Sequence, residues 1–131
     1  MDIGFRQMNM DVFGISKNIL SDFQGLKNIM REVADICGLN IITNLTASLD
    51  DKGQRILVVT DKGDIVIKTF PEREMLMIDC QINDESGLPV AICEYIFQKL
   101  GGALNLTRMS AFFERGVNYN ASNNPSINII N

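Results

Sequence analysis

Apolar residues recur at three- and four-residue steps in two stretches of the chain, and this spacing predicts two helices. The first stretch covers residues 23–37 and ends at Gly38, and Ser21 with Gln24 forms an S-x-x-Q capping box in front of it. The second covers residues 90–100, after a Gly-Leu-Pro opening and before a Gly-Gly pair. Each predicted helix has one apolar side, which another element has to cover.

Short apolar runs separated by turn signals predict strands in the rest of the chain. The turn sequences Asp-Asp-Lys-Gly at 50–53 and Asp-Lys-Gly-Asp at 61–64 are typical of hairpins, so we expect an antiparallel meander in the middle of the chain. The order of strand, helix, four strands, helix and strand predicts an α+β fold: a two-layer α/β sandwich with both helices on one face of an antiparallel sheet. The predicted strands span residues 5–15, 39–49, 54–60, 65–70, 75–82 and 103–113.

The length and composition predict one domain followed by a tail. The chain has 131 residues, of which 46% are apolar, and this is enough for a single hydrophobic core. We expect this domain to occupy residues 1–117. Residues 118–131 are rich in asparagine and poor in apolar side chains until the last isoleucines. They are predicted to form a flexible tail, with pairing of Ile127, Ile129 and Ile130 to a sheet edge as the alternative.

The charge balance bears on the partners of the protein. Twelve basic and sixteen acidic residues give a formal net charge of −4, and no run of Lys and Arg has the density that a phosphate backbone needs. We therefore expect no nucleic-acid partner. No apolar stretch reaches the roughly 20 residues of a membrane span, and the N-terminal residues do not have the pattern of a signal peptide. These observations predict a cytoplasmic protein without a membrane partner.

The chain contains no histidine, which excludes Ser-His-Asp and Cys-His catalysis and histidine-ligated metals. Any acid–base chemistry has to come from carboxylates, lysines, tyrosines or a perturbed cysteine. Cys37, Cys80 and Cys93 are widely spaced in apolar sequence, which predicts reduced structural thiols. Asp61 and Asp64 could hold a metal between them, but a tight turn needs the same residues, so no metal site is predicted.

The segment Phe70-Pro71-Glu72 places an aromatic ring and a carboxylate side by side after an apolar strand. Proline restricts the residue before it to an extended conformation and ends the strand. A ring in this position can stack on a purine, and a carboxylate can accept hydrogen bonds from both ribose hydroxyls. The pattern indicates a nucleoside site, with a core phenylalanine and a solvated glutamate as the alternative.

Residues 8–117 resemble the short bacterial S-adenosylmethionine decarboxylases. The order of elements agrees from the Met-Asp-Val-Phe-Gly segment at 10–14 through the capped helix and the strand that follows it. The most specific likeness is I-x-I-x-T-x-P-E, which spans Ile65 to Glu72 and is followed by Ile78-Asp79 at the family's spacing. The resemblance implies the family's sandwich fold, a link to polyamine synthesis, and pairing of subunits across their sheets.

The resemblance also implies a self-cleaving proenzyme, in which a serine becomes a pyruvoyl group that forms a Schiff base with the substrate amine. The family motif S-H-x-x-x-H-T-x-P-E places this serine at Gly63, the histidine beside it at Asp64 and the second histidine at Lys68. Because glycine has no hydroxyl, the N-to-O acyl shift cannot occur at Gly63, and we expect no pyruvoyl cofactor. Thr60 and Ser86 are the nearest hydroxyls outside the motif, and neither has the motif around it.

Two further positions of the family's chemistry differ in this chain. The cysteine that serves the family as a proton donor falls near Asn83, and Cys80, three residues away, is an imperfect substitute. The usual serine of the preceding strand falls on Arg55.

The binding residues that the resemblance implies suit a nucleoside better. The aromatic that stacks on adenine falls on Phe70, the glutamate that holds the ribose on Glu72, and the second stacking residue on Leu49. The residues that the family needs for catalysis are replaced, whereas part of its nucleoside-binding site is kept. This pattern predicts a protein that is not an active pyruvoyl-dependent decarboxylase.

Three functions compete on this sequence, which leaves open whether any catalysis remains. The leading hypothesis is a non-self-processing homologue that binds S-adenosylmethionine or a related adenosine compound, as a homodimer or higher homo-oligomer, or that partners a competent paralogous decarboxylase. The second is an enzyme that cleaves the sulfonium without pyruvoyl, in a lyase-type reaction. The third is a structural or protein-interaction module. The candidate groups for the second are Asp64, Lys68, Glu72, Glu74 and Cys80.

Overall fold

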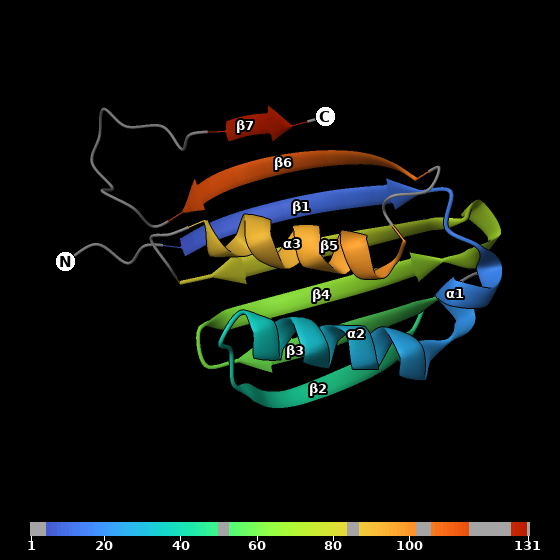
Figure 1. The fold of residues 1–131 in the computed structure, drawn as a ribbon, viewed down its shortest axis with the longest axis horizontal. Coiled ribbons are helices and arrows are strands. Elements are labelled where there is room, and N and C mark those ends of the chain that lie inside the picture. The colour runs from blue at the N-terminus through green and yellow to red at the C-terminus, as the bar shows by residue number, and fades with distance from the viewer. Residues whose placement is uncertain (1–4, 50–52, 84–86, 102–105, 116–126, 131) are drawn as a thin grey trace.

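The computed structural model describes residues 5–49, 53–83, 87–101, 106–115 and 127–130. The strands among them form one antiparallel sheet, in which the strand order is β2-β3-β4-β5-β1-β6-β7 (Figure 1). The strands are β1 (Phe5–Phe13), β2 (Ile41–Ser48), β3 (Gln54–Thr60), β4 (Gly63–Phe70), β5 (Met75–Ile82), β6 (Thr107–Arg115) and β7 (Ile127–Ile130). The helices are α1 (Lys17–Ser21), α2 (Phe23–Ile36) and α3 (Leu88–Lys99), with a 3₁₀ turn η2 (Pro71–Arg73).

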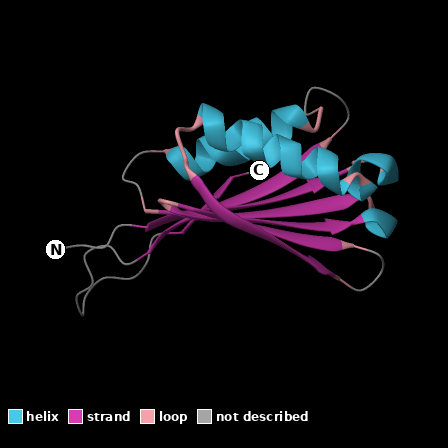
Figure 2. Ribbon diagram, turned by 90° about the horizontal axis from the view of Figure 1, so that it is seen from below, coloured by secondary structure: helices cyan, strands magenta, loops and turns pink. Residues whose placement is uncertain are grey.

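The helices lie on one face of the sheet, as Figure 2 shows, so the predicted two-layer α+β sandwich is confirmed. Alternate residues of β1, β3, β4 and β5 point toward this helix layer. In β1 these are Met8, Met10 and Val12, all at most 1% exposed. Each fully buried side chain of this size stabilises the fold by about 1.5–3 kcal/mol relative to exposure. The helices contribute Leu26, Met30, Val33, Ala34, Ile92, Cys93, Ile96 and Phe97 to the same core.

The opposite face of the sheet has no helix over it in the described part of the chain (Figure 2). Because strand side chains alternate, this uncovered face carries the residues that lie between the core positions. In β4 the core positions are Ile65, Ile67 and Thr69, so Lys68 and Phe70 belong to the uncovered face. The fold thereby places Lys68 and Phe70 on one surface.

The start of α2 differs from the predicted capping box. Ser21 is the last residue of α1, and the side chain of Asp22 caps α2 by accepting a hydrogen bond of 3.0 Å from the Gly25 amide. The Gln24 side chain donates to Asn28 instead of closing a box. The prediction was wrong because the short helix α1 already contains Ser21, and the carboxylate of Asp22 is then the next available cap.

The last isoleucines of the chain form a strand. Residues Ile127–Ile130 are β7 and pair antiparallel with β6, with Ile130 opposite Ser110 and Ile127 opposite Phe113. These four residues are therefore not a flexible tail, and the alternative of edge pairing holds for them. An alternating β-branched run beside an open strand edge favours such pairing. Residues 118–126 and 131 of the predicted tail lie outside the described residues.

None of the helices among the described residues combines the length and apolar character of a membrane span. Three free cysteines are present, of which Cys80 and Cys93 are buried and Cys37 is half-buried.

A polar clamp joins α3 to β6. One guanidinium nitrogen of Arg108 lies 2.6 Å from each carboxylate oxygen of Glu94, and the guanidinium carbon lies 4.7 Å from the centre of the Phe97 ring. Both charged side chains are more than 60% covered. The clamp therefore combines a charge-assisted hydrogen bond with a cation–π contact at a partly desolvated position.

We expect Arg108→Ala to lower the free energy of unfolding by about 1–2 kcal/mol, because it removes both contacts. The matched control is Lys99→Ala, which breaks a more exposed ion pair to Glu32 and should cost less than about 1 kcal/mol. Urea unfolding followed by circular dichroism measures both values. Equal losses for the two variants would contradict the role assigned to Arg108.

Candidate functional site

The turn between β4 and β5 is fixed by backbone contacts. Phe70 has φ −129° and ψ 78°, and buried Pro71 opens η2 directly after it. Glu74 adopts the left-handed conformation with φ 50°, and its carbonyl oxygen accepts hydrogen bonds of 3.0 and 3.1 Å from Gly14 and Ile15. A non-glycine residue persists in this conformation only where its surroundings hold it. Phe70 and the exposed Glu72 therefore stand on a rigid support.

Glu72 has a partner that the sequence did not predict. The Lys17 ammonium at the start of α1 lies 3.3 Å from the Glu72 carboxylate, with 58% and 56% of the two side chains exposed. Such exposed pairs contribute only about 0–1 kcal/mol, so ribose hydroxyls can compete for the carboxylate at small cost. Lys17 thus contacts Glu72 and leaves it exposed. The two residues are 55 positions apart in the sequence, which explains why no local pattern indicated the pair.

Leu49 lies at the same end of the sheet as Phe70. Its amide donates to the Gly53 carbonyl at 2.9 Å, and Gly53 packs so closely on Thr69 that a Cβ there would overlap the Thr69 carbonyl oxygen. The Thr69 hydroxyl in turn accepts from the Gln54 amide at 2.9 Å. These contacts tie the β2–β3 connection to the end of β4. The structure therefore brings the three predicted binding positions to one end of the sheet.

Gly63 begins β4 at the opposite end of this strand. Its φ is 150°, and a Cβ at this position would overlap the carbonyl oxygen of Gln81 and lie 2.9 Å from the Cα of Ile82. Glycine alone permits this approach of β4 to β5. A serine would therefore need a shift of the backbone as well as a change of side chain.

The groups around Gly63 serve the hairpin turn. The Thr60 hydroxyl donates to the Gly63 carbonyl at 2.8 Å and accepts from the Gly63 amide at 3.1 Å, so it is occupied within the turn. The Asn83 amide donates to the Lys62 carbonyl at 2.7 Å, which places Asn83 beside the turn residue that precedes Gly63. Ser86 lies outside the described residues.

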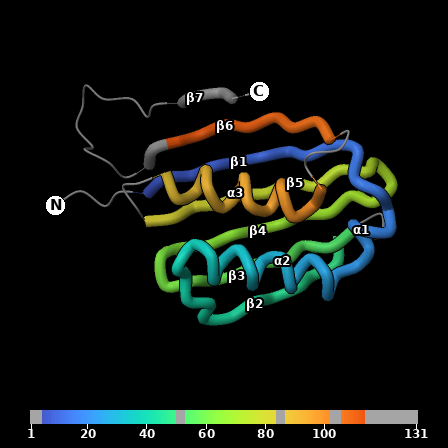
Figure 3. Tube along the Cα trace, in the orientation of Figure 1, coloured from blue at the N-terminus to red at the C-terminus, as the bar shows by residue number. Residues whose placement is uncertain are grey.

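The length of β4 separates the two groups of residues. Seven residue steps at about 3.3 Å each put Gly63 roughly 23 Å from Phe70. In Figure 3 the turn between β3 and β4 lies at one end of the tube, and α1 and the β4–β5 turn lie at the other. A small molecule held by Phe70 and Glu72 cannot touch Gly63 of the same chain.

The candidate catalytic residues do not lie together in the structure. Asp64 is exposed at the Gly63 end, whereas Lys68 lies two residues from Phe70 on the uncovered face. Glu74 is an exposed turn residue. Cys80 is 0% exposed and faces the helix layer, so it does not share a surface with the other candidates. A hydrogen bond to Cys80, followed by burial, raises the pKa of the Cys93 thiol well above its usual range.

The comparisons with known proteins agree with this fold. The model of the S-adenosylmethionine decarboxylase family matches residues 6–110. The chain belongs to this family. S-adenosylmethionine decarboxylase proenzymes of Brevibacillus brevis and Symbiobacterium thermophilum are 27% and 28% identical to it, over 72% and 74% of this chain and 71% and 74% of the relatives. The adenosylmethionine decarboxylase structure from Aquifex aeolicus superposes with a TM-score of 0.74, at 17% identity, over 94% of this chain and 98% of that chain.

Membership in the S-adenosylmethionine decarboxylase family confirms the resemblance and the fold. Within it, Gly63 stands where the resemblance implies the pyruvoyl-forming serine. Among the described residues, no three Cys, Asp or Glu side chains gather as a metal site would require.

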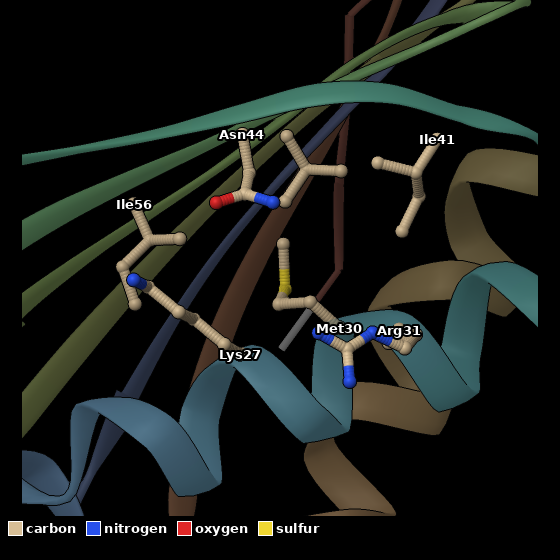
Figure 4. A pocket seen from close by; sticks show the side chains of 7 residues that line it. Lys27, Met30, Arg31, Ile41, Asn44 and Ile56 are labelled. Carbon is tan, nitrogen blue, oxygen red and sulfur yellow. The ribbon is translucent and has the colours of Figure 1, made fainter.

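Two hollows lie on the helix-covered side of the sheet. One has a free volume of about 20 Å³, room for about one water molecule, between α2 and the edge of the sheet (Figure 4). In Figure 4 the Asn44 amide points from β2 toward α2, which carries Lys27 and Arg31. The other, of about 210 Å³, lies among α1, α2 and the end of α3. Neither hollow is lined by a predicted site residue.

A carboxylate pair on the uncovered face also escaped prediction. Burial, with a smaller contribution from the charge of Asp79, raises the pKa of Asp11 above its ordinary value. The two residues lie on the neighbouring strands β1 and β5, with Asp11 opposite Met77 and Asp79 opposite Asn9. Only the strand register, which the sequence pattern did not supply, brings them together.

We expect Asp11→Asn to raise the stability at pH 7. A carboxyl whose folded pKa is raised binds more protons in the folded state, so its charge costs stability once the pH exceeds that pKa. Below about pH 4 both states of the wild type are protonated and the gain should vanish. Urea unfolding between pH 3 and 8 measures the difference.

Asp61→Asn is the control of opposite sign. Hydrogen bonds from the backbone and side chain of Asn40 lower the pKa of Asp61, so this variant should lose stability at pH 7 and approach the wild type in acid. Parallel pH profiles of the two variants would rule out the assigned carboxylate pair.

Proposed function

We propose that this chain is a non-self-processing member of its family that binds S-adenosylmethionine or a related adenosine compound at Phe70, Glu72 and Leu49. A single contrast carries the proposal. The end of β4 that carries these residues is held by the Glu74 and Gly53 contacts and presents a half-buried ring and an exposed carboxylate, whereas Gly63 begins the strand with no hydroxyl and no room for one. The binding end is intact, and the end that would make a cofactor is not.

Each binding residue has a defined part in holding the nucleoside. The half-buried ring of Phe70 offers a face to the adenine, because η2 ends the strand beside it. Glu72 accepts the ribose hydroxyls and exchanges its contact with Lys17 for them. Leu49 covers apolar surface at the same end. Stacking of a base on an aromatic ring contributes about 1–3 kcal/mol, so Phe70 is the main anchor.

Absence of self-processing follows from Gly63. The acyl shift that precedes a pyruvoyl group needs a hydroxyl on the residue after the cut, and Gly63 has none. The Thr60 hydroxyl is engaged with Gly63 backbone groups. The close approach to Gln81 and Ile82 argues that the backbone has adapted to glycine.

The same geometry supports a role beside a second chain. The roughly 23 Å between Gly63 and Phe70 means that a ligand at Phe70 can meet the start of a β4 strand only if another subunit supplies it. The uncovered face offers a surface for such a subunit, either a second copy or a competent paralogous decarboxylase. In that assembly this chain supplies the residues that bind the nucleoside.

Phe70→Ala should weaken the binding of S-adenosylmethionine about tenfold or more, because it removes the stacking surface. Glu72→Gln should weaken it less, since the amide still accepts one hydrogen bond. The control is Phe113→Ala, which removes a half-buried ring at the far end of the same face. Isothermal titration calorimetry gives the affinities. Wild-type affinity in both site variants would show that the site is wrongly placed.

Gly63→Ser should stay uncut and lose stability, because the new side chain collides with Gln81. Intact-mass spectrometry after incubation with S-adenosylmethionine follows both polypeptide and ligand, with the wild type beside it. We expect one uncut polypeptide and unchanged ligand for both. Cleavage of the serine variant would contradict the conclusion that the backbone at Gly63 accepts only glycine. Consumption of the ligand by the wild type would refute the non-catalytic role, and the product mass would distinguish decarboxylation from sulfonium cleavage.

A further inference from the structure

Two positive side chains lie directly opposite each other beside the proposed site. Arg55 of β3 pairs in register with Lys68 of β4, and both belong to the uncovered face. Lys68 precedes Phe70 by two residues, so the pair stands roughly 7 Å along the strand from the proposed stacking ring. Like charges directly opposite in a sheet are destabilising. The fold therefore bears a local cost at this point.

Neither cation has an ion pair among the described residues. Their next neighbours across the sheet are apolar: Ala47 lies opposite Arg55 on β2, and Met77 lies opposite Lys68 on β5. Asp79 stands diagonal to Lys68, opposite Val66, and no ion pair joins it to the lysine. The described chain thus leaves the two charges together without a counter-ion.

The stereochemistry of a nucleoside connects this pair to the proposed site. The 5′ carbon leaves the ribose on the side opposite the 2′ and 3′ hydroxyls. If Phe70 holds the base and Glu72 the two hydroxyls, a 5′ substituent that extends back along β4 reaches Lys68 and Arg55, which stand roughly 7 Å from the ring. The 5′ group of the ligand would then meet two positive charges, one of them a guanidinium that matches phosphate oxygens.

We propose that the site selects an adenosine compound that carries a phosphate at its 5′ position. S-adenosylmethionine is disfavoured relative to a 5′-phosphate in this arrangement, because the group bonded to its 5′ carbon is a positive sulfonium and its carboxylate lies at the far end of the methionine chain. This inference rests on the proposed function, since it assumes the nucleoside at Phe70 and Glu72. It goes further by assigning the ligand class and two specificity-determining residues.

Calorimetry with three probes tests the inference on the full chain: adenosine 5′-monophosphate, neutral 5′-methylthioadenosine and S-adenosylmethionine. We expect the monophosphate to bind about tenfold more tightly than the neutral compound, as two partly exposed charge contacts would allow, with a preference that falls as salt rises. The double variant Arg55→Gln, Lys68→Gln should lose this preference and keep the affinity for 5′-methylthioadenosine. Lys62→Gln, which removes an exposed lysine at the other end of β4, should keep both.

Stability provides a readout that does not depend on any ligand. The double variant should unfold at a higher temperature than the wild type, because the repulsion is removed, and the monophosphate should raise the unfolding temperature of the wild type alone. A less stable double variant would overturn the inference, because the pair would then serve the fold. Tighter binding of S-adenosylmethionine or 5′-methylthioadenosine through Phe70 and Glu72 would also overturn it and leave the proposed function standing. Binding of none of the three would refute both.

Discussion

Burial of apolar side chains on one face of the sheet is the constraint on which the other features depend. Helices α2 and α3 cover that face, so each strand beneath them has to alternate between core and uncovered positions. A slip of one residue in β4 would bring Lys68 and Phe70 into the core and expose Ile65 and Ile67. The register is therefore strongly specified. The composition of the uncovered face is a consequence of where the core lies.

Strand β4 connects two ends with different physical demands. At Gly63 the strand approaches β5 so closely that only glycine fits, and the Thr60 hydroxyl closes the turn. At Phe70 the proline and the left-handed Glu74 stop the ladder and hold the turn against β1. Gly63 therefore lacks more than a hydroxyl, because the backbone of Gln81 and Ile82 occupies the space that a side chain would need.

Local patterns were sufficient for most of the fold, because a helix or a strand reports its buried side through its own spacing. The hairpin turns, both long helices and the two-layer arrangement follow from such patterns. The cap of α2 did not, since Ser21 and Asp22 are equally suitable caps until α1 is known to contain Ser21. Strand β7 was left as an alternative, because four residues beyond an asparagine-rich stretch give only a weak signal.

The candidate site was predictable only in part, because a local pattern reports neighbours in the sequence and not contacts between distant segments. Phe70 and Glu72 are neighbours in the sequence, and the resemblance added Leu49. The Lys17 contact joins residues far apart in the chain, and the pairing of Arg55 with Lys68 depends on strand register. No pattern within one segment contains such information.

The two like-charged pairs show what the uncovered face is suited to. Arg55 and Lys68 stand opposite each other on β3 and β4, and the charge of Asp79 on β5 acts on Asp11 of β1. Met77 lies between Lys68 and Asp11 in one row across the sheet, so opposite charges approach without forming an ion pair among the described residues. A face selected for stability alone would interleave these signs, because adjacent opposite charges stabilise a sheet and like charges do not. Segregated charge at a locked strand end instead matches a ligand or partner that brings the missing counter-charges.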